Sequence, residues 1–211
     1  MIQYVGPYAM VLSAVLMVGC AAQPSALFRR GIDLLNRSEY ASAEAQMRAL
    51  IEGCERLPLS EDDAQAVASA YYVLGQALQG QGKHDAARRV FEDCLVRHGD
   101  NACSCLSLFG LVDVQVRAGD VELAANLLKE YAAKARNRYA AKEALGLVLG
   151  WPLLTATSTQ SQDRARLWTL IFSRVSSDEA GVMTQADALI KLNPQGKYAQ
   201  FARIVLSQIE P

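Results

Sequence analysis

One stretch of the chain, residues 71–99, constrains the fold more than any other. Large apolar and small residues recur in it at intervals of three and four, on both sides of a polar break at residues 81–83. These residues are Leu74 and Leu78 before the break and Ala87, Phe91 and Cys94 after it. Residues at this spacing share one face of an α-helix. The stretch therefore predicts two helices joined by a short turn, with Gly75 and Ala87 placed where the two backbones come close.

The signature residues of this stretch resemble those of a tetratricopeptide repeat, a pair of antiparallel helices about 34 residues long. That family has an aromatic residue, a Leu-Gly pair, a small Ala, a second aromatic residue and a helix-ending Pro. The corresponding residues here are Tyr71, Leu74, Gly75, Ala87, Phe91 and Gly99. Only Gly99 departs from the pattern, because Pro is usual there. One such unit cannot bury its apolar face alone, so the resemblance implies stacked neighbours and a binding surface.

The pattern recurs on both sides of this stretch. Gly119 follows Gly82 after 37 residues, close to the family period of about 34, and residues 37–40 indicate a further turn upstream. The predicted repeats are residues 24–57, 68–101 and 105–138. We therefore expect an all-α fold, a short right-handed α-solenoid of stacked helix-turn-helix repeats. An unrelated α-helical bundle with the same spacing by chance is the alternative.

The remaining third of the chain, residues 139–211, is helical in pattern but repeats less clearly. Helices are expected over residues 163–175, 184–192 and 197–209, and a polar loop over residues 155–162. The segment from Ala188 to Ala202 resembles the joints between repeats in tetratricopeptide lipoproteins of bacterial outer-membrane assembly. We expect either a degenerate fourth repeat or a set of capping helices here.

The first 20 residues predict a lipid anchor. Residues 11–18 are small and apolar and run into Gly19-Cys20. A short apolar stretch that ends in small residues is typical of a signal peptide and is too short to span a bilayer. A Cys after a small residue resembles the lipobox of bacterial lipoproteins. The resemblance implies that residues 1–19 are removed, that Cys20 is diacylated and that residues 20–23 link the anchor to the domain.

The residues around Cys20 also bear on localisation. Ala21, rather than Asp, follows the Cys, which in a Gram-negative cell implies transfer to the outer membrane with the domain facing the periplasm. One departure is that residues 1–10 contain no Lys or Arg. An ordinary secretory signal or an uncleaved anchor, with an incidental Cys20, is therefore the alternative.

Charge and motifs argue against nucleic-acid binding and catalysis. The formal net charge is −1, with both signs interspersed, and no basic patch interleaved with aromatic residues is present. The sequence contains two histidines and no serine-hydrolase elbow, zinc-protease motif or phosphate-binding glycine loop. We expect a protein that is not an enzyme and has no cofactor or bound metal.

Four cysteines remain besides Cys20: Cys54, Cys94, Cys103 and Cys105. In an exported chain an even number permits disulfides, and four cysteines allow three connectivities. The alternative is that Cys94 fills a small core position and the others are thiols. A further alternative is a metal- or redox-responsive site formed by Cys94, His98, Cys103 and Cys105. The spacing of that set matches no known zinc module.

Function is expected to come from a surface. In the repeat family the first helix of each pair lines a concave groove. The corresponding residues are Phe28, Ile32 and Leu35, then Tyr72, Gln76 and Gln79, then Phe109, Asp113 and Val116. Such a groove fits an extended or helical apolar segment of a partner protein. For Ile32, Leu35 and Val116, a place in the core between repeats is equally open.

These expectations combine into one interpretation. The chain is expected to be a lipid-anchored periplasmic scaffold that binds protein during assembly of a cell-envelope machine, such as a pilus, a secretion channel or an outer-membrane protein complex. The alternative is an accessory protein that uses the cysteine and histidine set. The partner and the oligomeric state are not encoded in any recognisable motif.

Overall fold

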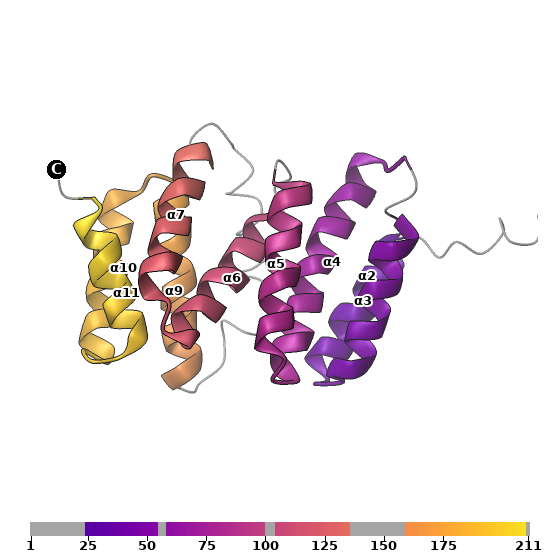
Figure 1. Ribbon diagram of the computed structural model, residues 1–211, viewed down its shortest axis with the longest axis horizontal. Coiled ribbons are helices and arrows are strands. Elements are labelled where there is room, and N and C mark those ends of the chain that lie inside the picture. Colours follow the sequence, from indigo (N-terminus) through magenta and orange to yellow (C-terminus); the bar gives the residue numbers. More distant parts are fainter. Residues whose placement is uncertain (1–23, 55–57, 100–103, 136–158, 210–211) are drawn as a thin grey trace, which may run out of the picture.

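The computed structural model describes residues 24–54, 58–99, 104–135 and 159–209. These residues form nine α-helices and no strand, so the expected all-α class is confirmed for them. The helices are α2 (Pro24–Asn36), α3 (Tyr40–Cys54), α4 (Glu61–Gly80), α5 (His84–His98), α6 (Ser104–Ala118), α7 (Val121–Ala135), α9 (Thr159–Val175), α10 (Glu179–Leu192) and α11 (Lys197–Ser207). Figure 1 shows them side by side in a row, with α2 and α3 at one end and α10 and α11 at the other. The predicted signal peptide, Cys20 and the linker lie outside the described residues.

The same backbone turn joins four pairs of helices. In each turn one residue has a positive φ: Ser38 at 61°, Gly82 at 74°, Gly119 at 102° and Ser177 at 58°. The next residue donates its N–H to the carbonyl five positions earlier, in the bonds Glu39 to Leu34, Lys83 to Leu78, Asp120 to Gln115 and Asp178 to Ser173. This arrangement satisfies the last carbonyls of a helix. The chain therefore builds α2–α3, α4–α5, α6–α7 and α9–α10 as equivalent pairs.

Packing between the pairs is also regular. Helix α4 packs against both helices of the first pair, α6 against both helices of the second, and α9 against both helices of the third. Helix α11 packs against α10 and returns to α6 and α7. Of the two expectations for the C-terminal region, the described part contains one element of each, a fourth helix pair and a single closing helix.

Small residues set the spacing between pairs two and three. The Phe91 ring of α5 is fully buried and lies against Gly75 of α4 and Gly110 of α6. A methyl group added to either glycine would overlap the ring. The close approach predicted at Gly75 is therefore present, and Phe91 fills the space that the two glycines leave.

Helix starts follow the sequence signals where these are strong. Ser60 caps α4, because its Oγ accepts the Asp63 N–H at 3.2 Å. The acidic residues of the first turn, Glu61, Asp62 and Asp63, face the positive end of the helix dipole. In the C-terminal region, α9 and α10 begin four and five residues before the predicted starts at 163 and 184, and α11 ends two residues before the predicted end at 209.

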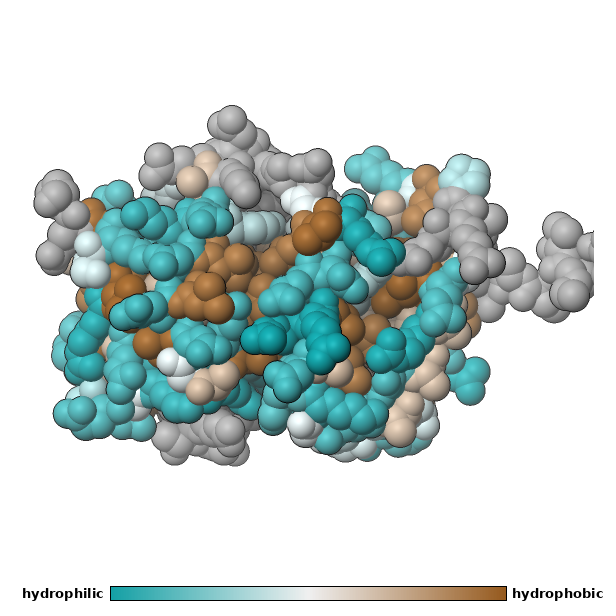
Figure 2. All heavy atoms as spheres, viewed as in Figure 1, coloured by the Kyte–Doolittle hydropathy of each residue, from teal (hydrophilic) through white to brown (hydrophobic). Residues whose placement is uncertain are grey.

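The outer surface is mostly hydrophilic, with isolated apolar residues. Figure 2 shows hydrophobic side chains between hydrophilic ones on the face that includes α5 and α7. The exposed large apolar residues of the described part are Val96, Leu123, Met183 and Leu192. None of the described helices combines the length and apolar character needed to cross a membrane.

Candidate functional site

The residues predicted to line a groove lie on the first helices of the first three pairs, as expected. Those of α2, namely Phe28, Ile32 and Leu35, are half-buried and pack against the core. On α4 and α6 all but Gln79 are buried: Tyr72, Gln76, Phe109, Asp113 and Val116 are each at most 6% exposed. Val116, at 0%, is a core residue, which is the alternative noted for it from the sequence. The positions on α4 and α6 are therefore not open to a partner in this structure.

Helix α9 covers these positions. The Trp168 ring stacks on the Phe109 ring with centroids 6.2 Å apart, and it meets the Tyr72 ring edge-on at 6.2 Å. Aromatic pairs at such distances are favourable in both geometries. The fourth pair thus reaches back over the third to contact the second. At these positions the chain's own α9 stands where the prediction placed a partner.

Arg164 lies one turn before Trp168 and adds polar contacts to the same surface. Its Nη2 donates to Gln76 Oε1 at 2.7 Å and to Gln79 Oε1 at 3.3 Å. The guanidinium also lies 5.1 Å from the centroid of the Trp168 ring, a cation–π distance. Arg164 therefore fixes the orientation of both amides, with their oxygens toward the cation and their nitrogens elsewhere.

A buried carboxylate connects three helices beside these contacts. Asp113 of α6 is 0% exposed, and its Oδ2 lies 3.0 Å from Arg164 Nε of α9. Its Oδ1 lies 3.2 Å from Arg117 Nε and accepts a hydrogen bond of 2.8 Å from the Tyr198 hydroxyl of α11. Arg117 Nε also donates to the Tyr198 oxygen at 3.1 Å. We call Gln76, Gln79, Asp113, Arg117, Arg164 and Tyr198 the polar seam.

Protonation states within the polar seam follow from burial and from Asp113. Burial and the neighbouring Asp113 charge raise the pKa of Tyr198 to about 12, against a smaller lowering by Arg117. Burial lowers the pKa of Arg117, but the Asp113 carboxylate and the Tyr198 oxygen together outweigh this effect, so the pKa is raised overall. Burial also raises the pKa of Tyr72 well above its ordinary value. At neutral pH both phenols are therefore hydroxyls and Arg117 is a cation.

Hydrogen bonding where α9 meets α4 is incomplete. Within the part of the chain that the structure describes, Gln76 Nε2, Gln79 Nε2 and Trp168 Nε1 are buried and have no hydrogen-bond acceptor. All three groups are donors, and each unmet donor costs about 1–3 kcal/mol. The contact between α9 and α4 is therefore less stable than its buried area alone would give.

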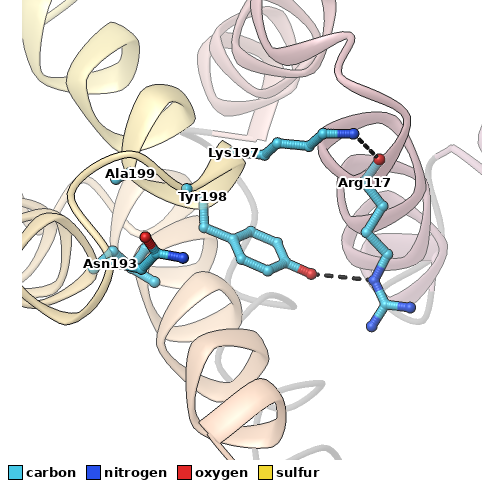
Figure 3. Close-up of a pocket in the computed structure, with 7 residues that line it drawn as sticks. Arg117, Asn193, Lys197, Tyr198 and Ala199 are labelled. Carbon is cyan, nitrogen blue, oxygen red and sulfur yellow. Dashed lines mark hydrogen bonds between the residues drawn. The ribbon is translucent and has the colours of Figure 1, made fainter.

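A pocket of about 250 Å³ opens where α11 begins. It is lined by Arg117, Leu189, Asn193, Gly196, Lys197, Tyr198 and Ala199. Figure 3 shows Tyr198 pointing from α11 toward Arg117, with Asn193 on the other side of Tyr198. Lys197 Nζ donates to the Arg117 carbonyl at 2.6 Å. Both cations of the pocket are thus held by contacts within the chain.

The cysteine residues are placed on three different helices. Cys54, Cys94 and Cys105 lie on α3, α5 and α6, are all buried, and are not joined to one another by disulfides. Cys94 is fully buried with its Sγ 3.6 Å from the Ala68 carbonyl, which fits the small core position considered for it. Cys103 lies outside the described residues, so any disulfide through it stays a prediction.

The alternative metal site gains no support from the described residues. No three His, Cys, Asp or Glu side chains gather in them closely enough to hold a metal ion. His98 ends α5, and its ring lies 5.4 Å from the Tyr71 ring. Burial raises the pKa of the Cys54 thiol, and the Asp63 charge raises it further. Cys54 is not a member of the alternative metal set, so this shift bears only on the reactivity of Cys54 itself.

Sequence reasoning missed the residues that close the groove. Arg164 and Trp168 are four residues apart, so the sequence places them on one helix face. Nothing in the neighbouring sequence indicates which helices that face contacts. Tyr198 lies in the segment that resembles a repeat joint, where it was considered only as part of the pattern.

The chain was also compared with known proteins. No family model, curated protein or solved structure matches it. The functional argument therefore depends on the chain's own residues and packing.

Proposed function

We propose that this chain is a tetratricopeptide-like scaffold that binds a partner protein and is held at the bacterial outer membrane, facing the periplasm, by a lipid on Cys20. Its setting would be the assembly of a cell-envelope machine, such as a pilus, a secretion channel or an outer-membrane protein complex. The observation that carries the proposal is the repeated helix pair. Four pairs share one turn geometry, and each successive first helix packs on both helices of the pair before it.

Repetition of this kind favours binding over catalysis. In repeat arrays each pair packs mainly on its neighbours, so the array extends a surface along the chain rather than enclosing one reaction centre. Two of the residues that match the family signature also pack on each other, Gly75 against Phe91. These points support the repeat family, and the family supports a protein partner.

The lipid anchor is supported by the N-terminal sequence. The apolar run ends in Gly19-Cys20, and α2 begins at Pro24. Acyl chains bind membranes through about 0.8 kcal/mol for each buried CH2 group, so a lipidated chain requires no apolar membrane face on its folded part.

Metabolic labelling with a clickable fatty acid tests the anchor. Wild-type protein should incorporate the label and sediment with membranes. Cys20→Ala should lose the label and move to the soluble periplasmic fraction or remain unprocessed. Incorporation of label into Cys20→Ala at the wild-type level would contradict the assignment.

Site-specific photo-crosslinking in cells tests the scaffold. A benzoylphenylalanine introduced at Val96, Leu123 or Met183 replaces side chains that are 84%, 54% and 59% exposed, so folding should be preserved. We expect at least one position to give a discrete adduct with one envelope protein, and positions on the opposite face to give none. Absence of an adduct at all three positions and along the half-buried face of α2 would contradict the proposal.

A further inference from the structure

The C-terminal unit is defined as α9, α10 and α11. Side chains of α9 and Tyr198 of α11 contact the face of α4 and α6 that the repeat pattern gives to a partner. We infer that this unit is an autoinhibitory occupant, and that its release opens a groove for a helix of a partner protein. The inference rests on the proposed function as a protein-binding scaffold. It adds what controls the groove and which chemistry the partner helix presents.

Contacts that hold the C-terminal unit in place include many polar ones. Arg164 binds Gln76, Gln79 and Asp113, and Tyr198 binds Asp113. Outside the polar seam, Lys197 donates to the Arg117 carbonyl, and Gln208 donates to Asn126 Oδ1 at 3.2 Å. Buried ion pairs add little net stability because desolvation offsets the attraction. The same contact also has an apolar part, in which Trp168 packs on Tyr72 and Phe109.

Buried N–H donors that lack an acceptor, on both α4 and α9, favour separation of the two helices. Gln76 Nε2 and Gln79 Nε2 on α4, and Trp168 Nε1 on α9, lack acceptors among the described residues while α9 is docked. All three regain hydrogen bonds to water once the surfaces separate. The docked state therefore contains a cost that the released state does not.

Contacts within the C-terminal unit allow it to move as one body. Helix α10 packs along both α9 and α11. Because α10 packs chiefly on α9 and α11, its buried residues Val182, Ala186 and Leu189 give the unit apolar contacts of its own, whereas α11 also packs on α7. Release of the polar seam then need not expose every apolar side chain of the three helices.

The chemistry of the partner follows from what α9 presents to the groove. Asp113 and the two amide oxygens accept from a guanidinium, and the rings of Tyr72 and Phe109 receive an aromatic side chain. On α9 these two groups are four residues apart. The partner is therefore a helix with Arg followed by an aromatic residue one turn later. An additional acceptor facing the Gln76 and Gln79 amides would let it bind more tightly than α9.

Hydrogen exchange on the full chain in detergent measures the release. In the wild-type protein the amides of α9 and α11 should exchange together, at least tenfold faster than those of α4 and α6. Arg164→Gln should accelerate α9 and α11 by a further tenfold or more and leave α4 and α5 unchanged. Lys191→Gln is the matched control, because its ion pair with Asp187 is exposed and lies outside the polar seam. Exchange of α9 only together with α4 and α6 in wild-type protein would overturn the inference.

Binding of a labelled peptide tests whether the face under α9 accepts a helix once α9 is released. The probe is a peptide of residues 159–175, followed by fluorescence anisotropy. It should bind Arg164→Gln protein at least tenfold more tightly than wild type, and the same peptide with Trp168→Ala should not bind. If the peptide fails to bind a variant whose α9 exchanges freely, the groove proposal is wrong. A crosslinked partner at the exposed positions would still support the scaffold, so the two failures are distinguishable.

Discussion

Arg164 Nε of α9 lies 3.0 Å from Asp113 Oδ2 of α6, and this ion pair joins the fourth helix pair to the third, with Asp113 fully buried and the Arg164 side chain 16% exposed. Asp113 also binds Arg117 and Tyr198, so one carboxylate serves two guanidiniums and a phenol. The local charge is therefore positive once Asp113 is removed. Asp113 should therefore contribute strongly to the free energy of unfolding.

Asp113→Asn is expected to lower the free energy of unfolding by about 3 kcal/mol, because it leaves two partly buried cations without a counter-charge. This value is at the low end of the stability losses seen when one partner of a buried ion pair is removed, because the Arg117 side chain is 34% exposed. Urea denaturation followed by circular dichroism gives the value. Asp187→Asn breaks the exposed pair with Lys191 and is the matched control, with an expected loss of about 0–1 kcal/mol. Equal losses in the two variants would contradict the role given to Asp113.

Gly75→Ala is expected to destabilise the protein by about 1–3 kcal/mol, since its methyl group would overlap the buried Phe91 ring. Gly53→Ala is the matched control. A Cβ at Gly53 meets nothing within 4 Å, so this variant should gain up to about 1 kcal/mol from helix propensity. Urea denaturation midpoints of Gly75→Ala and Gly53→Ala, each compared with the wild type, measure both effects.

The cause of the Gly75 effect can be isolated with a second change. Phe91→Leu removes part of the ring, so the double variant Gly75→Ala with Phe91→Leu should lose less than the sum of the two single losses. Additive losses would mean that Gly75 acts through the backbone and not through contact with Phe91.

How far the sequence predicts this molecule depends on whether a feature is local. The turn at Gly82 and the contact of Gly75 with Phe91 both follow from residues within one helix pair. The sequence predicts the turn and a small residue at a close approach, but not that the Phe91 ring lies against Gly75. The cap at Ser60 is local too. Such features are decided by residues close in sequence, which is why a pattern can report them.

Closure of the groove is not local. Asp113 meets Arg164 and Tyr198, which are 51 and 85 residues later in the chain, through the packing of α9 and α11 on α6. No motif records that packing, and a charged residue on a helix face reads as solvent-exposed until its partners are known. Tyr72 and Phe109 both contact Trp168, and nothing near them in sequence indicates that contact.

The Cys54 thiol is expected to react slowly with iodoacetamide near pH 8. Burial and the Asp63 charge raise its pKa, so the thiolate fraction is small and the folded protein should react more slowly than the urea-unfolded chain. Asp63→Asn should increase the rate modestly, because one of the two causes is removed. Peptide mass spectrometry of the alkylated Cys54 site measures the alkylation rate. A folded rate equal to the unfolded rate would contradict the burial of Cys54.

Stability should fall at high pH through Tyr198. Burial and Asp113 raise its pKa to about 12 in the folded protein, from an ordinary value of 10. The folded state therefore holds the phenolic proton more tightly than the unfolded chain. The resulting stabilisation is fully present below pH 10 and is lost as the pH rises from 10 to about 12. A difference of this size corresponds to about 3 kcal/mol. Tyr198→Phe should be less stable at neutral pH by about 1–2 kcal/mol, because the hydrogen bond to Asp113 is lost. Its free energy of unfolding should then decline less steeply between pH 10 and 12 than that of the wild type.

Tyr72 is also buried, and its pKa is raised in the same way, so some decline in the free energy of unfolding persists in Tyr198→Phe. Denaturant titrations of both proteins across this pH range measure the difference in slope, and parallel curves would show that Tyr198 is not the group responsible.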